Sequence, residues 1–485
     1  MLILRRLIAA LLLFTAFQTN AQSTNYLFEC WRKQVKFTQS QYLKFSYQET
    51  LNRFEHSFEP WQQSKYLGKG TIWSNYINFF KQDTLTNGKR TYFSKLEFTE
   101  SNMLFLDYGD KDLFPVSESL FFNQIFQTAR YSPIMLINYF FQQEIQIEKE
   151  SNEDVAIYRT IINKAIVKLY INKSESLISK VTILNDDELY GDVLSTFVYS
   201  NYSTRSKIFY PKTIKIEKVN GQLKDEVIIT DVLLVDKTPD LLNKPADYEI
   251  KKDKEVIPVI RVKKYSEHIH FIELEHTDDR VMVVEFKDFL LVAESPLNSE
   301  NGELIISEVK KIASDKPIKY FVFGHYHPHY LGGLRPFVHK EVTVLSTKSN
   351  INYVKYLANA SHSLNPDSLQ IQPKALLIEE IVKIKTITDG KFEMRIYNIG
   401  DKSRHTKDYL IYYFPDQKLL FEDDLVWIKR TGEVKQASKR QAGLYYAIKE
   451  LGLEIDTIIQ SWPVADYGVK TIIPFNDLEQ SINYR

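Results

Sequence analysis

Alternation of apolar and polar residues with a period of two is the feature that most constrains the fold of the first half of this chain. Successive side chains of a strand face opposite sides of a sheet, so this pattern predicts strands with one buried face. Asn-Gly pairs at 87–88 and 220–221 favour tight hairpins and therefore antiparallel pairing. The predicted strands are Gly70–Phe80, Arg90–Glu100, Asp154–Ile161, Ile166–Ile171, Ser179–Asn185, Ser195–Ser200, Lys212–Lys218 and Glu226–Val235.

Two segments of the first half depart from this pattern. Gln39–Arg53 and Ser117–Phe141 have helical spacing or few chain-breaking residues, which predicts helices. We therefore expect a curved antiparallel sheet with one or two helices packed in its concavity. In outline this arrangement resembles the lipoprotein-carrier type of half-barrel found in exported bacterial proteins.

The pattern of apolar and polar residues changes near residue 250. Residues 241–247, Leu-Leu-Asn-Lys-Pro-Ala-Asp, and the charged run at 251–255 predict a boundary between a β-rich domain at 22–250 and a second domain at 251–485. After the boundary, apolar strands alternate with an amphipathic helix, which indicates layered α/β structure. The predicted elements are strands His268–Glu275, Val281–Phe286 and Phe289–Ala293, helix Gly302–Ala313 and strand Ile318–Phe323.

The first 21 residues have the pattern of a signal peptide. Arg5 and Arg6 precede the apolar run Leu7–Phe17, and a small residue follows at Ala21. The run is too short to span a bilayer stably, so we expect an exported protein, periplasmic or extracellular, without a transmembrane segment after cleavage. A retained membrane helix is the alternative. The single cysteine, Cys30, excludes an intramolecular disulfide.

The charge balance excludes one class of partner. Lysine plus arginine and aspartate plus glutamate are 62 each, so the formal net charge is zero. Nucleic-acid binders normally carry a basic excess, so we do not expect a nucleic-acid partner.

Three histidines stand at alternating positions directly after the predicted strand Ile318–Phe323. His325, His327 and His329 would project to the same side of an extended segment, close enough to bind one metal ion. The Gly332-Gly333 pair that follows permits a sharp turn. A chance histidine cluster in a surface loop is the alternative.

Two further residues extend this pattern downstream. His405 stands alone before a strand-like segment, and Asp424 ends the hairpin that follows it. The ordered set resembles the metallo-β-lactamase fold superfamily, whose members carry a His-x-His-x-Asp-His loop followed by Gly-Gly, a later lone histidine, and an aspartate at the end of a hairpin. The segment at 286–296, with Glu294, looks like the one that precedes the loop in that family. The resemblance covers roughly residues 267–467, and it implies an αβ/βα sandwich.

The match to the family pattern is incomplete. By position, His325, His327 and His405 correspond to the histidines of the first zinc site, and Asp424 to the carboxylate that bridges two metals. The family aspartate of the loop is His329 here, the family histidine beside it is Tyr330, and the glycine before the bridging aspartate is Asp423. The segment 458–463 lacks the histidine of the final family motif. The resemblance therefore implies one metal ion rather than two.

The function implied by the resemblance is metal-dependent hydrolysis of a small molecule at an ester, amide, thioester or phosphoester bond. We expect one zinc ion, with iron or manganese as alternatives, held by His325, His327 and His405. Asp424 could bind the metal or its water, and His329 could be a ligand, a general base or a hydrogen-bond donor to a ligand. Tyr330 could stabilise an anionic intermediate or pack under the loop.

Two alternatives to an enzyme follow from the missing groups. One is a catalytically inactive binding or assembly protein of the cell envelope, in which the amino-terminal sheet is the surface that binds an envelope partner. The other is a structural zinc site without an open coordination position.

Overall fold

The structure, a computed structural model, describes residues 25–54, 58–88, 90–99, 102–107, 110–143, 148, 150–236, 248–251 and 257–484. The predicted signal peptide, the predicted linker at 241–247 and most of the charged run at 251–255 lie outside the described residues. Among the described residues, no helix is long and apolar enough to cross a membrane.

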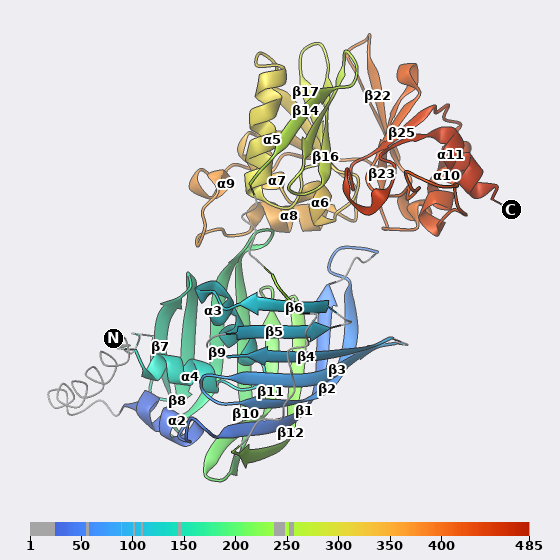
Figure 1. The fold of residues 1–485 in the computed structure, drawn as a ribbon. Helices are drawn as coiled ribbons and strands as arrows, with labels where there is room; N and C mark the ends of the chain where they lie inside the picture. The colour runs from blue at the N-terminus through green and yellow to red at the C-terminus, as the bar shows by residue number, and fades with distance from the viewer. Residues whose placement is uncertain are drawn as a thin grey trace.

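The first half forms one large, curved sheet, which Figure 1 shows as the lower part of the molecule. In the described residues its strand order is β13-β6-β5-β4-β3-β2-β1-β12-β11-β10-β9-β8-β7, with antiparallel neighbours except for the short parallel pair β13 and β6. The strands are β1 Tyr42–Phe54, β2 Gln63–Ser74, β3 Phe79–Asn87, β4 Arg90–Phe98, β5 Asn102–Asp107, β6 Asp110–Pro115, β7 Val155–Ile162, β8 Ala165–Asn172, β9 Leu177–Asp187, β10 Gly191–Arg205, β11 Ile208–Lys218, β12 Leu223–Val235 and β13 Glu249–Ile250.

Three helices pack on one face of this sheet: α2 Tyr26–Gln34, α3 Glu118–Thr128 and α4 Ile134–Phe141. Their apolar side chains share a core with inward-facing strand residues, in which Cys30 and Ile137 lie against residues such as Val181. The helical prediction at 117–141 is confirmed as two helices, and the Ser117 side chain caps the first of them.

The predicted helix at Gln39–Arg53 is wrong. This segment contains β1, which lies in the middle of the sheet between β2 and β12. Leu43, Phe45 and Tyr47 alternate with more exposed residues and are buried on the helix-covered face. Period-two burial and pairing on both edges therefore override the local helical spacing.

The predicted strand Gly70–Phe80 is also corrected, because it spans the end of β2, a turn and the start of β3. The side-chain oxygen of Asn75 accepts hydrogen bonds from the backbone amides of Ile77 and Asn78 at 2.8 and 2.7 Å. This side-chain-to-backbone turn reverses the chain without glycine or proline, so the alternating pattern does not reveal it.

The second half contains two sheets that face each other, shown in the upper part of Figure 1. In the described residues one sheet has the order β14 to β20, and the other has the order β21 to β26. The first comprises β14 Ile260–Lys264, β15 Ile269–Leu274, β16 Asp279–Glu285, β17 Leu290–Ala293, β18 Ile318–Val322, β19 Thr343–Ser346 and β20 Ile378–Glu380. The second comprises β21 Ile384–Thr388, β22 Glu393–Asn398, β23 Leu410–Phe414, β24 Leu419–Glu422, β25 Thr457–Gln460 and β26 Ile472–Pro474.

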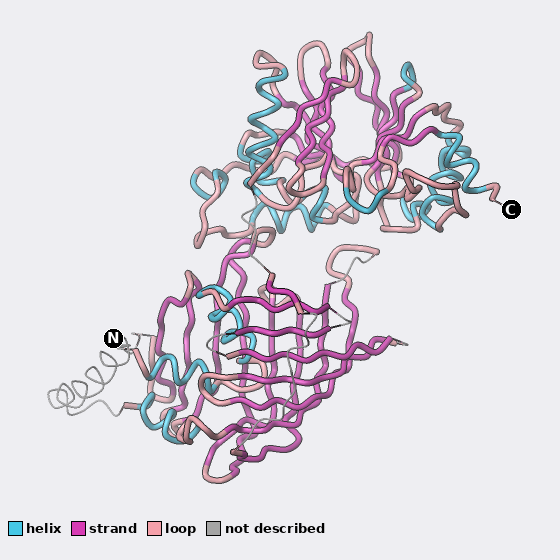
Figure 2. Tube along the Cα trace, viewed as in Figure 1, coloured by secondary structure: helices cyan, strands magenta, loops and turns pink. Residues whose placement is uncertain are grey.

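Helices cover the outer face of each of these sheets, and strands lie at the centre (Figure 2). Alternate residues of β15 enter different cores: Phe271 lies between the two sheets, whereas Ile272 faces helices α5 and α7. The outer face of the second sheet packs on α10 through Leu444 and Ile448. The layers therefore run helix, sheet, sheet, helix. The helices are α5 Ser299–Ile312, α6 Pro328–Leu331, α7 Leu334–His339, α8 Ile351–Asn359, α9 Ser368–Ile371, α10 Lys439–Leu451 and α11 Phe475–Ile482, with 3-10 turns η1 Gly400–Ser403, η2 Pro415–Gln417 and η3 Asp466–Gly468.

Direct contacts join the first half to the second. The Trp61 ring lies 5.0 and 4.8 Å from the rings of Tyr353 and Tyr356 in α8. On β10, Asp192 accepts hydrogen bonds from the hydroxyl and amide groups of the 361–364 segment. The backbone amide of Lys407 donates to the carbonyl of Phe58 at 2.7 Å. This last contact places the β1–β2 connection beside the loop that carries His405.

Candidate metal centre

His325 and His327 lie at the carboxyl end of β18, where the strand gives way to a loop and then to the short helix α6. The carbonyl of Gly324 accepts a hydrogen bond from the amide of Leu410 at 2.8 Å, which ties this loop to the start of β23. Loops at the carboxyl ends of strands are common positions for active sites in layered α/β folds. The contact brings the two sheets together at the histidines.

His405 reaches the same place from the second sheet. It follows the 3-10 turn η1 and precedes β23, and Arg404 before it adopts a left-handed backbone conformation with φ of 56°. The amide of His405 donates to the Ser403 hydroxyl at 3.2 Å. This tight turn holds the His405 side chain towards the first sheet.

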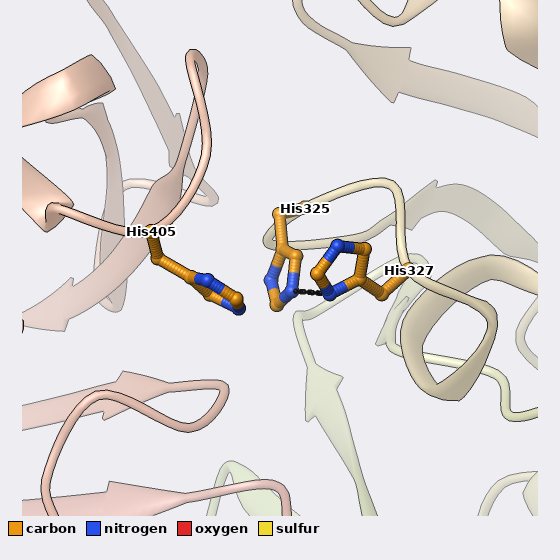
Figure 3. A group of neighbouring side chains, drawn as sticks. All are labelled: His325, His327 and His405. Atoms are coloured by element: carbon orange, nitrogen blue, oxygen red, sulfur yellow. Dashed lines mark hydrogen bonds between the residues drawn. The ribbon is translucent and has the colours of Figure 1, made fainter. Parts of the chain in front are cut away.

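The three imidazoles converge, as Figure 3 shows. His325, His327 and His405 each offer one ligand atom, and these atoms all lie within 4.8 Å of one another. Nε2 of His325 is 2.9 Å from Nδ1 of His327. The exposed fractions of His325 and His327 are 0% and 4%, and that of the His405 side chain is 3%. The structure therefore brings together the three residues that the sequence predicted as ligands of one metal.

Asp424 lies beside this triad, directly after β24. Its Oδ2 atom is 3.4 Å from Nε2 of His405 and 3.3 Å from the Arg440 guanidinium. The Tyr409 hydroxyl lies 3.3 Å from the other oxygen of Asp424. Burial acts against ionisation, but His405 and Arg440 outweigh it and hold the pKa of Asp424 below its usual value. Asp424 is therefore a carboxylate at neutral pH, next to a possible metal ligand.

His329 lies apart from the triad. Residues 328–331 form a helical turn rather than an extended segment, so His329 does not project alongside His325 and His327. Its Nδ1 atom lies 3.0 Å from the buried carboxylate of Asp279, at the start of β16. Burial would lower the pKa of His329, but the hydrogen bond and charge of Asp279 raise it overall. The Trp462 ring covers the same imidazole at 5.2 Å.

Tyr330 is buried under the loop. Its ring centroid is 4.4 Å from that of His325, and its backbone carbonyl accepts a hydrogen bond from Ser295 at 2.9 Å. Burial raises the pKa of Tyr330 well above its usual value, so the phenol stays protonated. This packing against a triad histidine is one of the two roles that the sequence suggested for it.

Buried carboxyl groups surround the triad. The Glu294 carboxyl accepts hydrogen bonds from the amide of Gly324 at 3.1 Å and the hydroxyl of Tyr412 at 2.8 Å. Burial raises the pKa of Glu294 to about 8 and that of Asp423 well above its usual range. Glu422 beside them is also raised to about 8 by burial. Glu294 and Glu422 therefore retain protons near neutral pH, whereas Asp424 is ionised.

Sequence reasoning missed two partners in this centre. The sequence pattern did not single out Asp279 or Arg440, which lie 50 and 16 positions along the chain from their partners His329 and Asp424. The strand order of the first sheet brings Asp279 to His329, and the packing of α10 on the second sheet brings Arg440 to Asp424. Asp423 departs from the glycine of the family pattern. An acidic side chain at a glycine position was the one feature of the sequence that indicated a further polar group in this centre.

The donor set fits a metal ion such as zinc. Three imidazoles are common zinc ligands, and a nearby carboxylate adds an oxygen donor of the kind that zinc also accepts. Nε2 of His405 is buried, and the Asp424 carboxylate lies 3.4 Å from it, so a nitrogen and an oxygen donor face the same space. The ring of His325 is also held from behind by the Asp423 carboxyl, 2.6 Å from Nδ1.

Comparison with known proteins gives structural likenesses only. No family model and no curated protein sequence matches the chain. A metallo-β-lactamase from Pontibacter korlensis is 16% identical with a TM-score of 0.33, over 46% of this chain and 98% of that one. The metallo-β-lactamase FIM-1 from Pseudomonas aeruginosa, in its mono-zinc form, is 14% identical with a TM-score of 0.34, over 46% and 93%. A flavoprotein from Thermotoga maritima is 13% identical with a TM-score of 0.33, over 47% and 61%.

At such low identities and TM-scores, the fold of the second half is established by its own strand order, its four layers and the position of its histidines. These features agree with the sandwich and the ligand order that the sequence pattern implied. Two facing sheets, outer helices and a histidine triad form the arrangement that the resemblance of the sequence to the metallo-β-lactamase fold implied for this half.

Proposed function

We propose that this protein is an exported, metal-dependent hydrolase with a single-metal centre formed by His325, His327 and His405. The observation that carries this proposal is the convergence of three buried imidazoles beside the ionised Asp424. When bound, the ion would supply Lewis-acid activation of a water molecule for attack on an ester, amide, thioester or phosphoester.

The surrounding residues support hydrolysis. The Asp424 carboxylate can accept a hydrogen bond from the attacking water and orient it. The pair formed by His329 and Asp279 resembles the acid-base pairs in which a carboxylate orients an imidazole, so His329 can hold the proton that a leaving group needs. Arg440, whose side chain is 35% exposed, provides a positive charge beside Asp424 for an anionic part of a substrate.

The proposed centre has one metal because the second set of family ligands is largely replaced. His329 is engaged by Asp279, and Tyr330 packs against His325. We propose zinc as the ion because its preferred ligands match three imidazoles, with iron and manganese as alternatives.

The amino-terminal sheet is proposed as a separate domain that forms a platform or lid beside the centre. Residues Phe58 and Glu59 contact Lys407, two positions after His405. This sheet would also be the surface for an envelope partner. Limited proteolysis near residue 250 should release two stable fragments if the division into 22–250 and 251–485 is right, and the amino terminus of protein secreted by its host should begin after Ala21.

The proposal is tested by metal analysis of purified wild-type protein beside His327→Ala and His405→Ala. We expect about one zinc or iron per chain in the wild type and its loss in both variants. His339→Ala is the matched control, since this histidine lies outside the triad and contacts the Gln372 carbonyl. A panel of small esters, thioesters and phosphodiesters should be hydrolysed by the wild type and not by the two variants.

Two outcomes would contradict the proposal. A wild-type protein that takes up no metal, even when zinc is supplied, would contradict the hydrolase proposal and favour a metal-free binding protein. Metal that is bound and raises the melting temperature without any turnover of the panel would indicate a structural site.

A further inference from the structure

Asp423 stands where the metallo-β-lactamase fold pattern has glycine, and it makes a contact that glycine cannot make. Its Oδ2 atom lies 2.6 Å from Nδ1 of His325, and both side chains have an exposed fraction of 0%. Asp423 follows β24 in one sheet, whereas His325 follows β18 in the other. The contact therefore spans the two sheets directly behind the histidine triad.

The surroundings of Asp423 are built to hold its carboxyl in this position. A Cβ atom on Gly324 would overlap the Asp423 carboxylate oxygens, so glycine at 324 leaves the space that the carboxyl occupies. The backbone of Asp423 is held on both sides, because its amide donates to the Tyr409 hydroxyl at 3.2 Å and its carbonyl accepts from the Trp462 amide at 3.0 Å.

The contact decides which nitrogen of His325 faces the triad. A neutral imidazole has one N–H group and one lone pair. A hydrogen bond from Nδ1–H to the Asp423 oxygen leaves the lone pair on Nε2, and Nε2 is the atom 2.9 Å from Nδ1 of His327. Carboxylates that hold the far nitrogen of a ligand histidine commonly fix its orientation and increase its basicity.

We infer that Asp423 is a positioning residue of the metal centre, which locks His325 with Nε2 towards the ion. This inference rests on the proposed function, because it concerns the same three histidines. It goes beyond that function by assigning metal affinity to a residue that replaces a glycine of the fold pattern.

The test compares the zinc affinity of the full chain with that of Asp423→Gly and Asp423→Asn, measured by competition with a chromophoric chelator. Asp423→Gly installs the family residue and should weaken zinc binding about 10- to 100-fold. Asp423→Asn keeps an acceptor oxygen of the same reach, so it should restore most of that loss. Asp416→Asn, an exposed aspartate in η2, is the control and should bind zinc as the wild type does.

A second readout follows the ligand geometry. Cobalt in place of zinc gives visible absorption bands that depend on ligand arrangement, and we expect the bands of Asp423→Gly to shift while those of Asp423→Asn stay close to the wild type. Gly324→Ala displaces the carboxyl without removing it and should weaken zinc binding as Asp423→Gly does. It serves as the decisive variant, together with Asp423→Asn, if Asp423→Gly does not fold by circular dichroism.

The outcomes separate this inference from the proposed function. Zinc affinity and cobalt bands of Asp423→Gly and Gly324→Ala that equal those of the wild type would overturn the inference and leave the hydrolase proposal standing. Weakened zinc binding in both variants, with no substrate turned over by any of the proteins, would support the inference while the hydrolase proposal fails. A wild type that binds no zinc would overturn both.

Discussion

The ion pair between Arg335 and Asp367 offers a sharp test of what holds the second half together. The Arg335 guanidinium donates to both carboxylate oxygens of Asp367, at 2.5 and 3.0 Å, and also to backbone carbonyls at the end of α8. Asp367 in turn caps α9 by accepting from the amide of Gln370 at 2.8 Å. One carboxylate therefore connects α7, α8 and α9.

The size of its contribution follows from its ionisation. Burial disfavours the ionised form of Asp367, but Arg335 and the Gln370 amide lower the pKa of Asp367 from 3.8 to about 2. Each pH unit of such a difference between folded and unfolded chains is worth about 1.4 kcal/mol, which sets an upper limit of roughly 2.5 kcal/mol. Solvent reaches part of the pair and screens it, so we expect about 1 to 2 kcal/mol.

Asp367→Asn removes the charge while keeping the size and the helix cap. Because the folded pKa is depressed, the stabilisation is fully present above about pH 4 and is lost as the pH falls through about 2. Urea unfolding should therefore show the variant about 1 to 2 kcal/mol less stable than the wild type at pH 7, with the gap reduced to about half at pH 3.

The control is Asp288→Asn, an exposed aspartate, which should change stability by no more than about 0.5 kcal/mol at either pH. The reasoning is refuted if Asp367→Asn is as stable as the wild type at pH 7. It is equally refuted if the gap is as large at pH 3 as at pH 7, because the stabilisation would then not come from the carboxylate charge.

Three further outcomes are expected. Trp61→Ala should lower the free energy of unfolding by about 2 kcal/mol, because the contact of the ring with α8 is lost. Trp61→Gly should be about 1 kcal/mol less destabilising, because φ is 67° at this position and glycine adopts that conformation without strain. Urea titrations that show Trp61→Gly to be the less stable of the two variants would contradict the strain argument. Gly191→Ala should lower the melting temperature, because φ is 70° and a Cβ atom would overlap the Ser361 carbonyl of the other half. An unchanged melting temperature would show that the two halves are not closely packed at this position. Cys30 should resist iodoacetamide at pH 8 until the protein unfolds, since burial raises the pKa of its thiol to about 12. Mass spectrometry measures the alkylation, and modification of Cys30 in the native protein would contradict its burial.

Much of the architecture could be predicted from local pattern. Period-two alternation indicated most strands of the first sheet, and the predicted helical structure at 117–141 is confirmed. The failure at Gln39–Arg53 has a physical cause, since a strand paired on both sides gains ladder hydrogen bonds and burial that a short segment's helical spacing does not report. The order of the histidines and Asp424, through its resemblance to the metallo-β-lactamase fold, likewise indicated the sandwich and the grouping of the three histidines.

The sequence by itself therefore determined the candidate ligand set, because the residue types of His325, His327, His405 and Asp424 and their order are properties of the chain. Tertiary structure decided which groups support them. The side chains of Asp279 and Asp423 reach His329 and His325 across 50 and 98 residues of sequence. Separations of this length leave no periodic trace in a sequence. The first contact depends on the strand order of one sheet, and the second depends on how the two sheets close on each other.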